Sequence, residues 1–297
     1  MKKIILTIVL AGCGIASQAQ LMTVNDAKTK FEASVEYRGG TPIGKPGDAM
    51  RFNDKNRDFG NPEGTVYTHE ALWHNFIFSP MTKLGVEAHH MSNDGVGNGN
   101  GNHYFRFGLN GMHVFMLPGY TRGISVTANL YAEASQFGVH RFDGVISTIF
   151  LYRMQQKNTQ GVGFVWLCNN PQNMIGMPIY ILKKDWGEHW SLNFMTWMGD
   201  FSYHFNKRFT LSASYGFGFE RYWFKPEGHD LMMDNQTVLT PSASLQWTVS
   251  KRLNFTITGG GNLAFMNVIM NAAGTEIIDR RDARLSAFGM GKLSYNF

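Results

Sequence analysis

The chain has little charge, almost no cysteine and no long apolar run, and each of these shortages excludes a class of protein. Asp, Glu, Lys and Arg make up 16% of the 297 residues, against about 25% in soluble domains, so a soluble protein would expose too little charge. With only two cysteines, one of them in the first 20 residues, a disulfide framework is excluded. No segment approaches about 18 consecutive apolar residues, which excludes helical membrane spans.

The first 19 residues are typical of an export signal. Two lysines are followed by an apolar run, residues 4–10, and small residues at 16–19 offer a cleavage site after Ala19. We therefore expect a cleaved signal peptide, 1–19, and a single domain, 20–297. A second interpretation stays open, because the sequence from Leu10 to Cys13 resembles a lipobox whose cysteine is acylated.

Net charge argues against nucleic acid as a partner. The formal charge of +5 includes Lys2 and Lys3, and their removal leaves 5 − 2, or about +3. That charge is too weak and too dispersed to bind a phosphate backbone.

The chain does have sustained alternation of apolar and polar residues, over the roughly 9–11 residues that a membrane strand needs. From Phe209 to Glu220, apolar odd-numbered residues alternate with Thr, Ser, Gly and Glu. The same pattern occurs in Phe31–Arg38, Ile124–Glu133, Leu239–Val249, Leu253–Phe265 and Leu285–Phe297. An apolar face for lipid and a polar face for a lumen are what a transmembrane strand requires.

Short turns and long polar stretches separate these segments. The short turns are Ser79–Thr82, Leu117–Tyr120, Gln156–Thr159, Lys184–Gly187, Asn206–Lys207 and Ser250–Lys251. The longer stretches are Gly39–Gly64, Ser92–Asn102, Asn169–Gly176, Lys225–Asn235 and Asn271–Arg281. This rhythm predicts an all-β fold, a closed antiparallel transmembrane β-barrel of even strand number with short periplasmic turns and longer outer loops. The count is roughly 14 strands, or roughly 12 if Trp190–Phe205 is one interrupted hairpin.

The middle of the chain departs from the pattern. Val145–Met154, Gly161–Cys168 and Ile179–Leu182 carry apolar residues on both faces, which indicates either a narrow, side-chain-filled lumen or a plug. Pro178 is expected at a strand end, because proline cannot donate to a ladder.

The C-terminus carries a family resemblance. Leu293-x-Tyr295-x-Phe297 resembles the assembly signal of bacterial outer-membrane proteins, which implies insertion by the outer-membrane assembly machinery. The stretch Pro171–Phe205 looks like uncharacterised outer-membrane barrel families of unknown function, which lend no activity. The resemblance implies location in the bacterial outer membrane, in contact with its lipid.

Inward-facing polar residues are the candidate functional residues. The predicted lumen-lining set is Glu32, Glu36, Arg38, Arg106, Asn129, Glu133, Glu220 and Lys292. Mixed charges can line a water-filled pore, or they can pair with one another and close it. We expect a narrow pore or channel for passive passage or binding of a small-molecule solute. The alternative is a non-transporting surface barrel whose loops bind partners.

The sequence offers little evidence for a catalytic site or a metal site. His189, Ser191 and Asn193 share one strand face and resemble the His-x-Ser element of outer-membrane lipases, but the rest of that signature is missing. None of the ten histidines forms a recognised zinc spacing, although pairing across strands stays open. We therefore predict no cofactor, no metal and no enzyme, with lipid hydrolysis at His189 and Ser191 as the remaining alternative.

Overall fold

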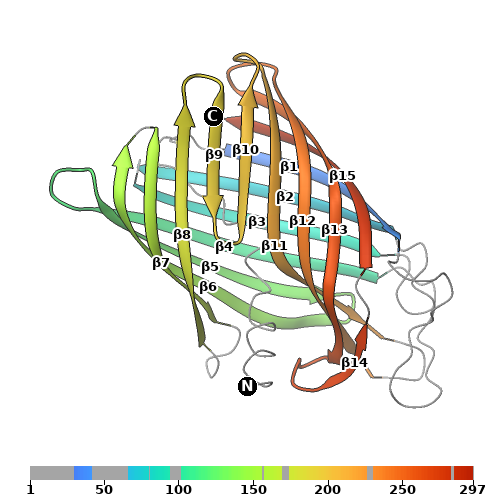
Figure 1. Cartoon of the computed structure of the whole chain (residues 1–297). Helices are drawn as coiled ribbons and strands as arrows, with labels where there is room; N and C mark the ends of the chain where they lie inside the picture. The colour runs from blue at the N-terminus through green and yellow to red at the C-terminus, as the bar shows by residue number, and fades with distance from the viewer. Residues whose placement is uncertain are drawn as a thin grey trace.

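The computed structural model describes residues 30–41, 66–79, 81–93, 102–155, 157–168, 174–225, 230–281 and 284–296 (Figure 1). The predicted signal peptide, Cys13, Phe297 and most of the stretch Gly39–Gly64 lie outside these residues. Within them, no helix is long and apolar enough to cross a bilayer.

Fifteen strands make up the described structure. They are β1 (Lys30–Thr41), β2 (Val66–Ser79), β3 (Thr82–Asn93), β4 (Asn102–Met116), β5 (Gly123–Ser135), β6 (Gly138–Gln155), β7 (Asn158–Cys168), β8 (Met174–Trp186), β9 (Trp190–Met195), β10 (Met198–His204), β11 (Phe209–Phe224), β12 (Met232–Thr248), β13 (Leu253–Asn271), β14 (Ile277–Arg281) and β15 (Arg284–Asn296).

All strand pairings are antiparallel, and strands adjacent in sequence pair from β1 through β13. β13 also pairs with β15, and β15 pairs with β1, so the pairings return to their starting strand. β14 pairs only with β13 in the described residues, which leaves 15 − 1, or 14, strands in this ring of pairings. The larger predicted count is therefore right. The smaller is wrong, because Trp190–Phe205 contains two separate strands, β9 and β10.

Alternation in the sequence becomes a difference between the two faces of the sheet. Leu211 and Leu245 are 44% and 45% exposed, while Ser212 and Ser244, next to them, lie on the partly buried face. In β15, Leu293 is 46% exposed and Ser294 is 5% exposed. Because side chains alternate across a strand, one face of the sheet is apolar and exposed, and the opposite face is the inner one.

The predicted turns form one end of the ring. Strands β2 to β3, β4 to β5, β6 to β7, β8 to β9, β10 to β11 and β12 to β13 join at the six short turns expected from sequence. We call this the turn end and the opposite end the loop end. The expectation of long loops throughout the loop end is wrong at two places, since β5–β6 and β9–β10 join through residues 136–137 and 196–197.

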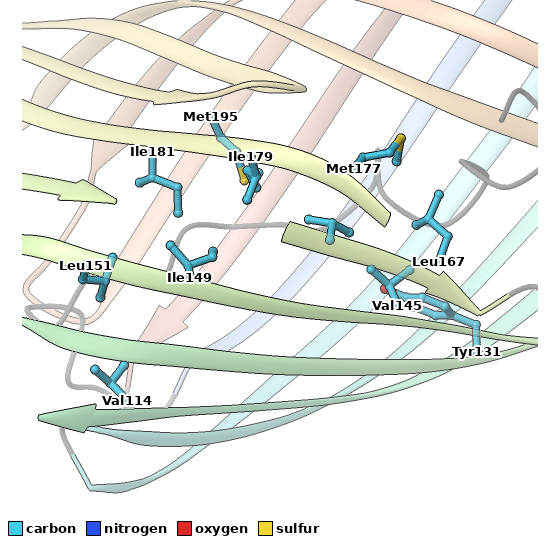
Figure 2. Close-up of a cluster of buried hydrophobic side chains, with 11 residues drawn as sticks. Val114, Tyr131, Val145, Ile149, Leu151, Leu167, Met177, Ile179, Ile181 and Met195 are labelled. Atoms are coloured by element: carbon cyan, nitrogen blue, oxygen red, sulfur yellow. The ribbon is translucent and has the colours of Figure 1, made fainter. Parts of the chain in front are cut away.

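The strands with apolar residues on both faces bury one of those faces (Figure 2). The buried set is Val114, Tyr131, Val145, Ile149, Leu151, Val165, Leu167, Met177, Ile179, Ile181 and Met195, which we call the apolar cluster. It lies on the inner face of β4–β9, where these apolar side chains fill part of the interior. Pro178 lies inside β8 rather than at its end, opposite Phe164 of β7.

β11 changes its surroundings along its length. Its odd-numbered residues are exposed near the turn end, as Leu211 is, yet Arg221 and Trp223 are 5% and 2% exposed. Both side chains contact residues of β6, five strands away in the ring. The loop-end part of β11 therefore lies against the inner face of the far wall.

Candidate functional site: a charged cluster across the ring

Arg221 of β11 joins two carboxylates that belong to the opposite side of the ring. Its Nη1 donates to Glu133 Oε2 of β5 at 3.2 Å and to Asp143 Oδ2 of β6. The three side chains are 1%, 6% and 4% exposed. These contacts span strands that are not neighbours in the sheet, so the cluster crosses the interior.

Two further arginines complete the cluster. Arg106 Nη2 of β4 lies 3.0 Å from Glu133 Oε1, and Arg141 Nε of β6 lies 2.5 Å from Asp143 Oδ1. Each carboxylate thus lies between two guanidinium groups, which satisfies the buried charges on both sides. We call Arg106, Glu133, Arg141, Asp143 and Arg221 the charged cluster.

A third carboxylate balances the three guanidinium groups. Glu87 of β3 is 4% exposed and lies over Gly108 of β4. A Cβ at position 108 would lie 2.5 Å from Glu87 Cγ, so glycine leaves the room that this side chain occupies. Three arginines and three carboxylates then gather on the inner face of β3–β6 and β11.

Aromatic packing holds β11 in this position. Trp223 stacks on His140 of β6, with ring centroids 4.8 Å apart and planes 16° apart. Its indole Nε1 donates to Ala272 O at 3.4 Å. Tyr104, Met233, Val268 and Met270 pack around it and are each less than 10% exposed. Burial of this apolar surface stabilises the inward position of β11, and this position brings Arg221 within hydrogen-bond distance of Glu133 and Asp143.

A second polar array follows the inner face at the turn end. Asn193 Nδ2 of β9 donates to Asp200 Oδ1 of β10 at 3.1 Å, and Ser202 Oγ donates to Asp200 Oδ2 at 3.0 Å. Ser202 Oγ also lies 2.7 Å from Ser212 Oγ of β11. Ser214 of β11 is hydrogen-bonded to Ser242 of β12 at 2.8 Å. Small polar side chains therefore continue around the inside from β9 to β12.

The proposed pairing of His189 with Ser191 is wrong. His189 Nδ1 is hydrogen-bonded to His204 O at 2.7 Å, outside the array. Ser191 Oγ instead lies 3.1 Å from His204 Nε2 of β10, and His204 Nδ1 lies 2.9 Å from Thr210 Oγ1. A threonine hydroxyl takes the position where a carboxylate would orient a catalytic histidine, and Asn193 is held by Asp200. His189, Ser191 and Asn193, the residues of the lipase alternative, are therefore hydrogen-bonded to other groups and not to one another.

The structure brings together two of the predicted lumen-lining residues, Arg106 and Glu133. Asn129 lies on the same face of β5 as Glu133, and Lys292 is half-buried on the face of β15 that carries Ser294. The side chains of Glu32, Glu36, Arg38 and Glu220 are outside what the structure describes, although their backbones pair within β1 and β11. In the C-terminal motif, Leu293 is exposed and Tyr295 is half-buried opposite Phe31 and Leu253.

Sequence reasoning missed Arg221, Asp143 and Arg141. The sequence did contain a hint of the role of Arg221. Arg221 is an odd-numbered residue of β11, and all the odd-numbered residues from Phe209 to Phe219 are apolar. A charge on the face that meets lipid is costly unless the strand leaves the wall there. Asp143 and Arg141 lie in β6, where apolar residues on both faces hid which face is the inner one. No local pattern therefore marked these two residues as inward-facing.

Two histidines approach one another across strands without forming a metal centre. His90 Nε2 of β3 lies 3.0 Å from His103 Nδ1 of β4, and the rings stack. In the described part of the chain, no group of three or more His, Cys, Asp or Glu residues has an arrangement that could hold a metal ion.

No family model matches the chain, and no curated protein matches it in sequence. Several solved structures resemble it. A KdgM porin in complex with disordered oligogalacturonate is 9% identical, with 89% of this chain and 99% of that chain covered and a TM-score of 0.36. A FadL homologue from Pseudomonas aeruginosa is 8% identical, with coverage of 92% and 91% and a TM-score of 0.48. An outer membrane channel from Pseudomonas putida F1 is 9% identical, with coverage of 92% and 98% and a TM-score of 0.46.

Proposed function

We propose that the chain closes into an outer-membrane β-barrel and provides passive passage, or a binding site, for small solutes. The observation that carries this proposal is the contrast between the two faces of the 14-strand ring of pairings. The inner face holds hydrogen-bonded Ser, Asn, Asp, Thr and Arg side chains, and the outer face exposes apolar ones. A barrel of this strand number is wider than the 8-stranded kind that side chains fill alone.

An aromatic belt at the turn end supports the membrane position. Trp186, Trp190, Phe205 and Trp247 are 40%, 43%, 51% and 44% exposed, and Trp190 stacks on Phe201 with centroids 4.9 Å apart. Aromatic side chains are enriched where a membrane protein crosses from lipid to water. The exposed Leu, Ile, Val and Phe residues beyond this belt would then face the hydrocarbon region.

The charged cluster would set the narrowest part of the path. Its side chains meet across the interior at the loop end, where an open lumen would otherwise continue. Paired guanidinium and carboxylate groups admit small polar solutes more readily than large ones, because little free width is left between them.

Planar-bilayer conductance of the purified protein, together with liposome swelling in arabinose, tests the proposal. Stepwise conductance and solute-dependent swelling are expected. Absence of both in protein that migrates as a heat-modifiable barrel overturns it, and leaves the alternative of a non-transporting surface barrel with partner-binding loops.

A further inference from the structure

The hairpin formed by β9 and β10 is too short to complete the wall. β9 has 6 residues and β10 has 7, whereas the flanking β8 and β11 have 13 and 16. At about 3.3 Å per residue the two short strands extend about 20 and 23 Å along their own axes. With a tilt of about 35–45°, they rise roughly 14–19 Å, less than the apolar band of about 25 Å.

β8 and β11 both continue past this hairpin towards the loop end (Figure 1). The pairing of β9 with β8 ends at Met195 opposite Ile181, and that of β10 with β11 ends at Met198 opposite Gly216. Beyond these points, no strand in the described part of the chain pairs with β8 on that side. Among the described residues, two strand widths of wall are therefore missing between β8 and β11 towards the loop end.

Pro178 marks the exposed edge of β8. Thr196 N donates to Tyr180 O at 3.2 Å and Tyr180 N donates to Thr196 Oγ1 at 2.9 Å, so the backbone groups of Tyr180 point towards the hairpin. Backbone groups alternate between the two sides of a strand, so the nitrogen of Pro178, two residues earlier, points the same way. Proline there removes a donor from an edge that has no neighbouring strand and prevents another chain from adding to it.

Apolar side chains border the missing wall from inside. Met177 and Ile179 of β8 are 9% and 4% exposed, and Met195 at the tip of β9 is 4% exposed. All three belong to the apolar cluster, which continues along the inner face to β4 (Figure 2). An apolar lining thus runs from the interior to the place where the wall stops.

One polar group lies within this apolar border. Trp197, in the turn of the hairpin, packs against the cluster, and its ring lies 5.9 Å from that of Phe217. Its indole Nε1 is buried, and no described residue accepts a hydrogen bond from it. A buried donor of this kind is stabilised by an acceptor on a visiting molecule.

We propose that the gap between β8 and β11 is a lateral opening through which small apolar or amphipathic molecules pass between the interior and the bilayer. The inference rests on the proposed function, and it names the class of solute. The charged cluster restricts the axial route at the loop end, while the gap lies beside the membrane and is bordered by Met177, Ile179 and Met195. An apolar body with one hydrogen-bond acceptor, such as a fatty acid or a phenolic compound, fits this border and the N–H of Trp197.

Fluorescence quenching in liposomes tests the opening. The full chain carries Cys13→Ser and Cys168→Ser and one new cysteine labelled with bimane, at Ile179→Cys beside the gap or at Ile149→Cys deeper in the same cluster. Ile146→Cys, on the exposed outer face of β6, serves as the lipid-facing reference. Doxyl-labelled stearate in the bilayer is the amphipathic quencher, and potassium chloride conductance is recorded on the same preparations.

A second variant closes the gap. Insertion of Thr-Val-Thr-Asn-Gly-Thr-Val-Thr between Thr196 and Trp197 lengthens both strands of the hairpin around an Asn-Gly turn. The matched control inserts a Gly-Ser sequence of equal length at the same point, which adds residues but no strand. The quenching constant at position 179 is expected to fall about tenfold with the strand insertion, equivalent to about 1.4 kcal/mol. It should change little with the Gly-Ser insertion, and position 146 should not change.

The outcomes separate the two proposals. Conductance without quenching at position 179 overturns the lateral opening and leaves the pore. Equal quenching at 179 before and after the strand insertion, in protein that still migrates as a folded barrel, also overturns the opening. Loss of conductance and of quenching together in the parent protein overturns the proposed function, and the lateral opening with it.

Discussion

At the scale of single residues, Arg221 makes the ion pairs that cross the interior. Its guanidinium group is 1% exposed and faces Glu133 and Asp143, which belong to other strands. Removal of one partner from such a group leaves buried charges without compensation, whereas the intact pair adds little net stability.

Arg221→Met is therefore expected to lower the free energy of unfolding by about 3–5 kcal/mol, because two carboxylates lose a shared partner. The same change is expected to raise potassium chloride conductance, because the contact across the interior is lost. Unfolding in urea with detergent and bilayer recording measure the two effects. Arg208→Met, in the exposed turn before β11, is the control. Unchanged conductance in Arg221→Met would show that the cluster does not limit the path.

Ser191 allows the remaining enzyme alternative to be tested. Its hydroxyl is hydrogen-bonded to His204, and Ser191→Ala is expected to lower stability by about 0.5–1.5 kcal/mol, the net contribution of one such bond. Any lipid hydrolysis by the purified protein should stay the same, as measured by fatty-acid release from phospholipid vesicles. A loss of hydrolysis in Ser191→Ala but not in Ser202→Ala would instead support catalysis at this residue.

At the scale of elements, the strands differ in what each face meets. β12 exposes Leu245 and Trp247 on one side and turns Ser242, Ser244 and Gln246 to the other. The loop-end half of the same strand is buried on both faces from Met232 to Val238, because β11 and β12 bend inward there. A strand can thus serve as membrane wall at one end and as interior filling at the other.

This difference predicts unequal effects for two adjacent substitutions in β12. Leu245→Arg is expected to destabilise the folded protein by about 1–2 kcal/mol, because the charge enters the lipid just inside the aromatic belt, between the interface and the midplane. Gln246→Arg is expected to have little effect, because its side chain faces the polar interior. Unfolding in lipid vesicles measures both. Equal destabilisation would mean that the exposed face of β12 does not contact lipid.

At the scale of the whole molecule, the ring of pairings depends on its last strand. β15 pairs with β1 on one side and β13 on the other, so the first and last described strands lie side by side. Assembly of the ring therefore requires the C-terminal strand to find two partners that are far apart in sequence. We expect the motif Leu293-x-Tyr295-x-Phe297 to direct this step in the outer-membrane assembly machinery.

Deletion of Phe297 is expected to reduce the assembled fraction in a bacterial outer membrane, without changing the conductance of each assembled molecule. Heat-modifiable migration of membrane fractions measures assembly, and bilayer recording measures conductance. Phe265→Ala, an aromatic change in β13 away from the terminus, is the control. Normal assembly of the deletion variant would remove the proposed role of the motif.

Local sequence patterns by themselves determined the alternating strands, their exposed faces and the turn end. Alternation in Phe209–Glu220 and Leu239–Val249 depends only on neighbouring residues, and so do the six short turns. The resemblance of Leu293-x-Tyr295-x-Phe297 to the outer-membrane assembly signal also depends only on residues close together in the sequence. These features were predictable because a strand that separates lipid from a polar interior must alternate along its own sequence.

Only the tertiary structure decided which charges meet across the interior and where β8 and β11 continue beyond the hairpin between them. Arg221 meets Asp143 because β11 bends inward across the ring, and no local pattern encodes a contact between residues 78 positions apart. The gap beside Pro178 arises because β9 and β10 stop before β8 and β11 do. Both depend on which strands become neighbours, and strand pairing between distant parts of the chain cannot be read from the sequence of any one strand.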